Sequence, residues 1–147
     1  MRLSLTLIPF LFALLLSAPA FGADKDTGWR SPEHLDGATT IDTAQAAALH
    51  AQGVVFIDAR SSRLYTKRHI PGAIHLDLKS ALTEANMQAV VGKNDPVILY
   101  GNGVHCSRGY KAVNKALEFG YTQVYYYRVG FRSWRKAGHP ITRGSNP

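Results

Sequence analysis

Short apolar runs are separated by longer amphipathic segments along most of the chain. A continuous apolar run of this length is typical of a strand that is buried on both faces of a sheet. The sequence predicts four such strands: "VVFID" at 54–58, "AIHL" at 73–76, "VILY" at 97–100 and "QVYYY" at 123–127.

The segments between these runs carry helical patterns and helix-end signals. Asp42 is a typical N-cap with Gln45 as its capping-box partner, and Gly53 is a typical stop. Further helices are expected at 62–67, 80–89, 107–120 and 130–138. No hairpin joins two of the runs, so the alternation predicts an α/β fold with a parallel central sheet and helices on both faces.

The first part of the chain predicts export. Residues 1–23 have one positive charge, an apolar stretch from Leu5 to Leu16 and then small residues, as a cleavable signal peptide does. The stretch is short for a membrane span, which needs roughly 20 residues, although an uncleaved anchor is the alternative. Cleavage is expected after Ala20, Gly22 or Ala23. The prediction is a signal peptide at 1–23, a polar leader at 24–37 and a domain at 38–143, in a periplasmic or secreted protein.

The net charge and the distribution of basic residues indicate which kinds of ligand the protein binds. The net charge is +7, and only Arg2 is lost with the signal peptide. Adjacent basic residues occur in no run longer than Lys67–Arg68 or Arg135–Lys136. This dispersed field favours small anions over nucleic acid, with a merely soluble basic surface as the alternative. Neither nucleic acid nor a stable membrane association after cleavage is expected.

The segment between the third strand and the next helix holds the chain's single cysteine. Gly101 and Gly103 give the loop backbone freedom, and ligands of such sheets bind at the carboxyl ends of the strands. Loop amides and a helix N-terminus bind anions and favour a thiolate at Cys106, with Arg108 and His105 as further positive groups. This chemistry suits attack on an anionic sulfur compound and formation of a persulfide.

Two other chemistries fit the residues less well. A cysteine phosphatase needs an arginine six residues after its cysteine, and that position is Ala112. One cysteine with scattered histidines gives no metal-ligand spacing, so neither a metal nor an organic cofactor is expected. A redox thiol that forms mixed disulfides is a further alternative.

Two segments resemble the rhodanese family of sulfurtransferase domains. The sequence "VVFIDARSSRLYTKRHIPGAIHL" is similar to its first signature, with Asp58, Arg60, Tyr65 and the run from His69 to Ile74. The sequence "GYTQVYYYRVGFRSWRKAGHPI" is similar to its closing signature, which includes Trp134. With the loop between them, the resemblance covers roughly residues 39–142. It implies a rhodanese-like fold. Asp58 and Arg60 lie at the end of a predicted strand and are expected to support the site as a buried ion pair or through hydrogen bonds to the loops, with a catalytic role as the alternative.

The loop departs from the family pattern. The family's catalytic cysteine is the first loop residue, which is Gly101 here, and Cys106 lies near the loop's end. The sequence is similar to a sub-type of the form Cys-Asn-Gly-x-x-Cys-x-Arg that has lost its first cysteine. Either Cys106 has become the sulfur acceptor, or the domain only binds an anion or a partner protein.

The resemblance implies a sulfurtransferase that moves sulfane sulfur from thiosulfate or a persulfide through a cysteine persulfide to a thiol or cyanide. Its partners are a small sulfur-containing anion and a thiol acceptor. Cys106 is the candidate catalytic residue. The candidate substrate-binding residues are the other loop and helix-start residues: Gly101, Asn102, Gly103, Val104, His105, Ser107 and Arg108.

Overall fold

The computed structural model describes residues 28–146 and contains a five-stranded parallel sheet of order β1-β5-β4-β2-β3. The strands are β1 (Ala38–Thr40), β2 (Val55–Asp58), β3 (Ile74–His75), β4 (Val97–Tyr100) and β5 (Val124–Tyr127). The helices are α1 (Thr43–Ala51), α2 (Ser62–Lys67), α3 (Glu84–Gln88), α4 (Ser107–Glu118) and α5 (Gly130–Lys136). The predicted parallel α/β fold is confirmed. The predicted signal peptide at 1–23 lies outside the described residues.

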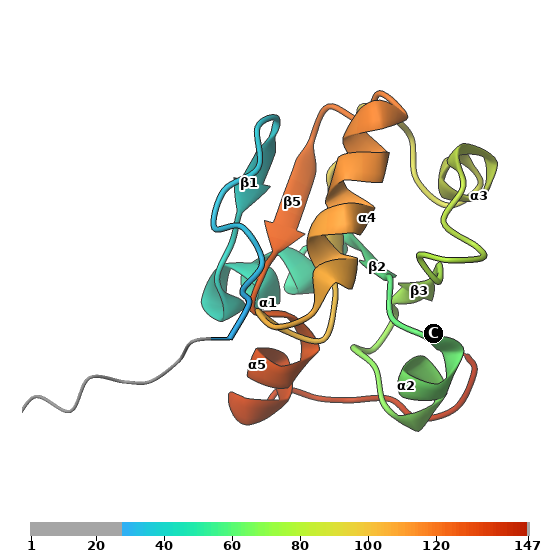
Figure 1. Cartoon of the computed structure of the whole chain (residues 1–147). Helices are drawn as coiled ribbons and strands as arrows, with labels where there is room; N and C mark the ends of the chain where they lie inside the picture. The colour runs from blue at the N-terminus through green and yellow to red at the C-terminus, as the bar shows by residue number, and fades with distance from the viewer. Residues whose placement is uncertain (1–27, 147) are drawn as a thin grey trace, which may run out of the picture.

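Helices cover both faces of the sheet because successive strand residues point to opposite sides. Ile57, Leu99 and Tyr126 pack into one core together with residues of α3 and α4. Phe56, Ile98 and other alternate strand residues pack into a second core with residues of α1 and α5. Figure 1 shows α4 running along one face of the sheet in front of the strands.

Local signals explain most element boundaries. Helix α1 begins at the predicted capping box, in which Asp42 accepts from the Gln45 amide at 2.8 Å and the Gln45 side chain accepts from the Asp42 amide at 2.9 Å. Helix α3 is shorter than predicted, because the Asp77 carbonyl accepts from the amides of Ser80, Ala81 and Leu82 and closes a separate turn there. Strand β1 was not predicted, since "ATT" has no apolar run and pairs only with β5 at the sheet edge.

The candidate site lies at the carboxyl ends of the strands. Figure 1 shows α2 and α5 at the end of the sheet to which the arrowhead of β5 points, which is also the end where α4 begins. Within residues 28–146, no helix has the length and apolar character needed to cross a membrane.

Candidate functional site

The loop between β4 and α4 is held on one side by α5. The carbonyl of Gly101 accepts from the Phe131 amide at 3.1 Å, and that of Asn102 accepts from the Arg132 amide at 3.0 Å. Gly130 has a φ of +56°, and a Cβ there would collide with the Gly101 carbonyl oxygen. The tight approach of α5 to the loop therefore requires glycine at this position.

On its other side the loop contacts α4 through a pair of glycines. A Cβ added to Gly101 would lie 2.8 Å from the backbone nitrogen of Gly109 and 3.3 Å from its Cα. Real Cβ atoms do not come this close to backbone, so position 101 has no room for a side chain in this arrangement. The same hypothetical Cβ would lie 3.4 Å from the Cys106 sulfur. The thiol of Cys106 thus lies next to the first loop residue although it is five positions later in sequence.

Cys106 is the N-cap residue of the twelve-residue helix α4, and its side chain makes no capping hydrogen bond. It is partly exposed and lines a cavity of about 60 Å³ together with Asn102, Gly103, His105 and Arg132. Sequence reasoning missed Arg132, which is thirty residues from the loop's first positions and reaches it only because α5 packs there. A partly exposed cysteine and a cationic side chain therefore line the same cavity.

The loop also offers backbone donors. The Cys106 amide donates to the Gly103 carbonyl at 2.9 Å, whereas the amides of residues 102–105 make no hydrogen bond within the part of the chain that the structure describes. The first-turn amides of α4 have no intrahelical acceptors, as at any helix start. Together with the positive end of the helix dipole, these donors make the loop suitable for an anion.

Arg108 is directed away from this cavity. Its guanidinium donates to Asp77 at 2.7 Å and to the Ala59 carbonyl at 3.0 Å. Burial acts to raise the pKa of Asp77, but hydrogen bonds from the Lys79 amide and from Arg108 outweigh it and lower that pKa below its ordinary value. These contacts favour a role for Arg108 in tying α4 to the segment after β3, and its contact with an anion stays a prediction.

Asp58 and Arg60 form a buried ion pair, which is one of the two structural arrangements that the sequence predicts for them. Both are buried, and the Arg60 guanidinium donates to Asp58 through Nε at 2.9 and 3.0 Å and through Nη2 at 2.6 Å. Burial opposes the charge of Arg60, but the hydrogen bonds and charge of Asp58 raise its pKa above the ordinary value. Tyr100 donates to Asp58 at 2.7 Å. Burial, and then the nearby carboxylate, raise the pKa of Tyr100 well above its ordinary value.

Part of the predicted polar leader lies against the loop. The Ser31 amide donates to the Val104 carbonyl at 2.7 Å, and His105 Nδ1 donates to the Trp29 carbonyl at 3.0 Å. The Trp29 ring lies 5.9 Å from the ring of Tyr110, centroid to centroid. Trp29 and Ser31 of the leader are therefore packed against the loop. His105 remains exposed beside the Cys106 cavity.

Comparison with known proteins identifies the domain. The family model of the rhodanese-like domain matches residues 30–137. The chain belongs to the rhodanese-like domain family. A thiosulfate sulfurtransferase GlpE from Pseudomonas fluorescens is 30% identical over 110 residues, which cover 73% of this chain and 94% of that protein. One from Pseudomonas savastanoi pv. phaseolicola is 32% identical over 95 residues, covering 65% and 85%.

Solved structures agree on the fold. The BH2092 protein from Bacillus halodurans superposes with a TM-score of 0.65 at 24% sequence identity, covering 72% of this chain and 77% of that chain. The Alr3790 protein from Anabaena has a TM-score of 0.62 at 21% identity, covering 70% and 91%. These likenesses establish the rhodanese-like architecture of the sheet and helices.

In this rhodanese-like domain, the packing of Gly101 against Gly109 gives a physical reason for the unusual loop. A side chain at position 101 would require the end of β4 or the start of α4 to move. Within residues 28–146, no group of three or more His, Cys, Asp or Glu side chains is placed where it could hold a metal ion.

Proposed function

We propose that this protein is a sulfurtransferase that carries sulfane sulfur on Cys106. The observation that carries the proposal is the position of the sulfur, 3.4 Å from where a Cβ on Gly101 would lie and open to a cavity shared with Arg132. The relatives named thiosulfate sulfurtransferase support the reaction class. The thiol at the loop's end takes the place of the cysteine that the family carries at its beginning.

The proposed reaction has two steps. The Cys106 thiolate attacks the outer sulfur of thiosulfate, the bond between the two sulfur atoms of thiosulfate breaks, and sulfite leaves with the bonding electron pair. The product is a cysteine persulfide. Cyanide or a thiolate then attacks the terminal sulfur, which leaves as thiocyanate or as a new persulfide, and the Cys106 thiolate is restored. Neither step needs an oxidant or reductant besides the sulfur donor and the acceptor, because the sulfur that moves is already at the sulfane level.

The residues of the site supply positioning and charge. The free loop amides and the start of α4 favour the anionic donor and the departing sulfite. Arg132 adds a full positive charge beside Cys106. Phe131 and Arg132 also hold the loop through their backbone amides, so the geometry at Cys106 depends on α5.

The test is to incubate the reduced protein with thiosulfate and to measure its intact mass. Because the chain has one cysteine, an adduct of about 32 Da that cyanide removes identifies the persulfide on Cys106. Cys106→Ser is the control and is expected to gain no mass. A protein that keeps its fold and gains no sulfur from thiosulfate or from a persulfide donor contradicts the proposal.

A binding module without turnover is the second candidate. The observation that favours it is the pair Gly101 and Arg108: the first has no side chain, and the second is tied to Asp77. In that case the loop amides hold an anion or a partner protein, and no covalent adduct forms. Saturable anion binding by Cys106→Ser and wild type alike, without any mass gain, would favour this function.

Export is part of the proposal. Its support is the charged, apolar and small-residue order of residues 1–23. Expression in a Gram-negative host with analysis of the periplasmic fraction tests it. The mature N-terminus is expected directly after Ala20, Gly22 or Ala23, and a full-length, membrane-associated chain would contradict a cleavable signal.

A further inference from the structure

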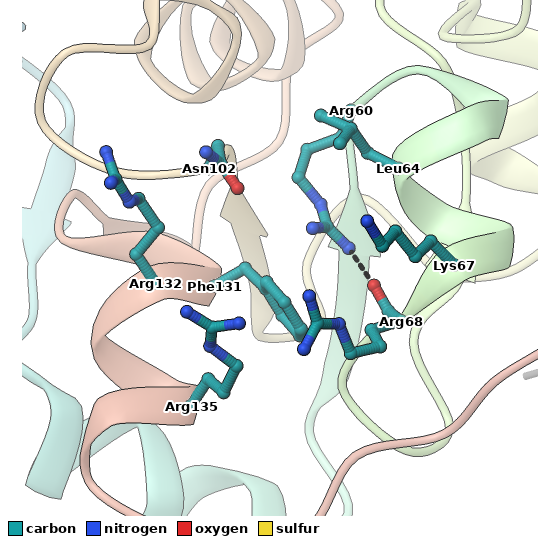
Figure 2. A pocket seen from close by; sticks show the side chains of 8 residues that line it. All are labelled: Arg60, Leu64, Lys67, Arg68, Asn102, Phe131, Arg132 and Arg135. Carbon is teal, nitrogen blue, oxygen red and sulfur yellow. Dashed lines mark hydrogen bonds between the residues drawn. The ribbon is translucent and has the colours of Figure 1, made fainter.

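A second and larger cavity lies between α2 and α5, beside the loop. Its volume is about 340 Å³, which is within the range of small-molecule sites. Its lining consists of five cationic side chains, one amide and two apolar side chains, with no acidic residue: Arg60, Leu64, Lys67, Arg68, Asn102, Phe131, Arg132 and Arg135. We call this cavity the cationic pocket, and Figure 2 shows its side chains.

Four of the five cations have no ion-pair partner among the described residues. Lys67, Arg68, Arg132 and Arg135 form no ion pair with any residue between positions 28 and 146. The first two come from the end of α2, and the other two come from α5 on the opposite wall. Figure 2 shows the side chains of Arg68 and Arg135 extending toward each other near Phe131. Like charges gathered in one cavity repel each other, and a bound anion removes that cost.

Two further polar side chains, those of Arg60 and Asn102, line the cationic pocket. Arg60 is 1% exposed, and its hydrogen bonds are made through Nε and Nη2 to Asp58 and the Arg68 carbonyl. Its guanidinium also lies over the Phe131 ring, 4.1 Å from the ring centroid, and Arg60 lines the cavity. The side-chain amide of Asn102 has no hydrogen bond within residues 28–146. The polar amide of Asn102 is thus available to a ligand beside the guanidinium of Arg60.

We propose that the cationic pocket binds a small molecule with two tetrahedral oxyanion groups, of the phosphate or sulfonate kind. Guanidinium groups match such oxyanions through paired N–H donors. Cations on two opposite walls fit a ligand that is charged at both ends better than a single ion. Leu64 of α2 and Phe131 of α5 add one apolar side chain to each wall.

The cationic pocket adjoins the Cys106 cavity, because Asn102 and Arg132 line both. Binding there nevertheless uses no atom of Cys106. The inference therefore stands or falls separately from the sulfur-transfer proposal, and Cys106→Ser is expected to bind the ligand as wild type does.

The experiment is isothermal titration calorimetry of the purified protein at fixed ionic strength. The probes are inorganic pyrophosphate and ethane-1,2-disulfonate, with orthophosphate as the single-group reference. We expect one site per chain and an affinity at least ten-fold higher for one of the two-group probes than for orthophosphate. Whichever of the two binds more tightly identifies the oxyanion kind.

Matched variants separate a built site from a general positive field. Arg135→Gln and Lys67→Gln are expected to weaken binding at least five-fold each. Lys136→Gln and Arg63→Gln lie on the same two helices but do not line the pocket, and both are expected to stay within two-fold of wild type. Absence of saturable binding, equal affinity for orthophosphate, or equal weakening by the control variants would overturn the proposal.

Discussion

The two sides of the loop that carries Cys106 differ in packing and in charge balance. On the inner side, Gly101 contacts α4 with no room for a Cβ. Arg108 and Arg60, the latter of which also lines the cationic pocket, are each held by a carboxylate. On the outer side are an open cavity and cations that have no partner among the described residues, such as Arg132. Paired, packed charges fix the shape of a site, whereas unpaired ones are available to a ligand, so substitutions on the two sides should have different effects.

The largest effect on stability is expected from Asp58. Asp58→Ala leaves Arg60 charged and buried without its partner and leaves the Tyr100 hydroxyl without its acceptor. Removing one member of a buried pair costs about 3–5 kcal/mol of unfolding free energy. Urea unfolding followed by circular dichroism measures this loss.

Asp77→Ala is the matched control for this prediction. It breaks a pair with Arg108 that is partly exposed, and exposed pairs contribute about 0–1 kcal/mol. Equal losses for the two variants would contradict the view that Asp58 and Arg60 are the principal support of the site.

The next largest effect concerns position 101. Gly101→Cys restores the family's cysteine in sequence, but its Cβ would lie 2.8 Å from the Gly109 nitrogen. We expect a loss of about 1–3 kcal/mol, as is usual for overpacking, and no gain of sulfurtransferase activity. Unfolding measurements and the thiosulfate assay check both parts. A stable variant that is strongly active where wild type is inactive would show that the loop adapts to a first cysteine and that Cys106 does not carry sulfur in the natural chain.

The sequence predicts most of the secondary structure of this domain but not the packing of the loop. Four strands and five helices were predicted because buried parallel strands are continuous apolar runs and helices carry end signals, as Asp42 does. Strand β1 has neither signal. Spacing alone placed Cys106 near the loop's end but did not reveal its proximity to position 101. The loop conformation depends on close packing against Gly109 and against Gly130 of α5, and spacing along the chain does not report such packing.

The cationic pocket was beyond sequence reasoning for the same reason. The basic doublets at 67–68 and 135–136 were visible as two isolated features of a dispersed charge. In the folded protein, α2 and α5 both lie at the carboxyl end of the sheet. Arg135 of the second doublet therefore lines the same cavity as Lys67 and Arg68 of the first doublet. Sequence patterns describe residues that are close along the chain, so they do not predict that two distant basic segments line one cavity.

A smaller effect is expected from the pH dependence of stability. The pKa of Asp77 is lowered in the folded protein, so its contribution is fully present above the unfolded pKa of about 4 and is lost as the pH falls through the lower folded value. Wild type should therefore lose on the order of 1 kcal/mol more than Asp77→Asn between about pH 5 and pH 2. Parallel stability curves for the two proteins would mean that the pair with Arg108 contributes nothing.

The smallest effect tests the outer side of the loop through the reactivity of Cys106. Iodoacetate and iodoacetamide alkylate the same sulfur, but only the first is an anion, so the ratio of their rates reports the local potential. Arg132 shares the cavity of Cys106, and Arg132→Gln is expected to lower the ratio about two- to five-fold at low salt. Lys136→Gln removes the same charge from α5 outside the cavity and should leave the ratio nearly unchanged. The difference should shrink as salt screens the field. If both variants change the ratio equally, the attraction comes from the net charge of the whole protein, and Arg132 has no special place beside the thiol.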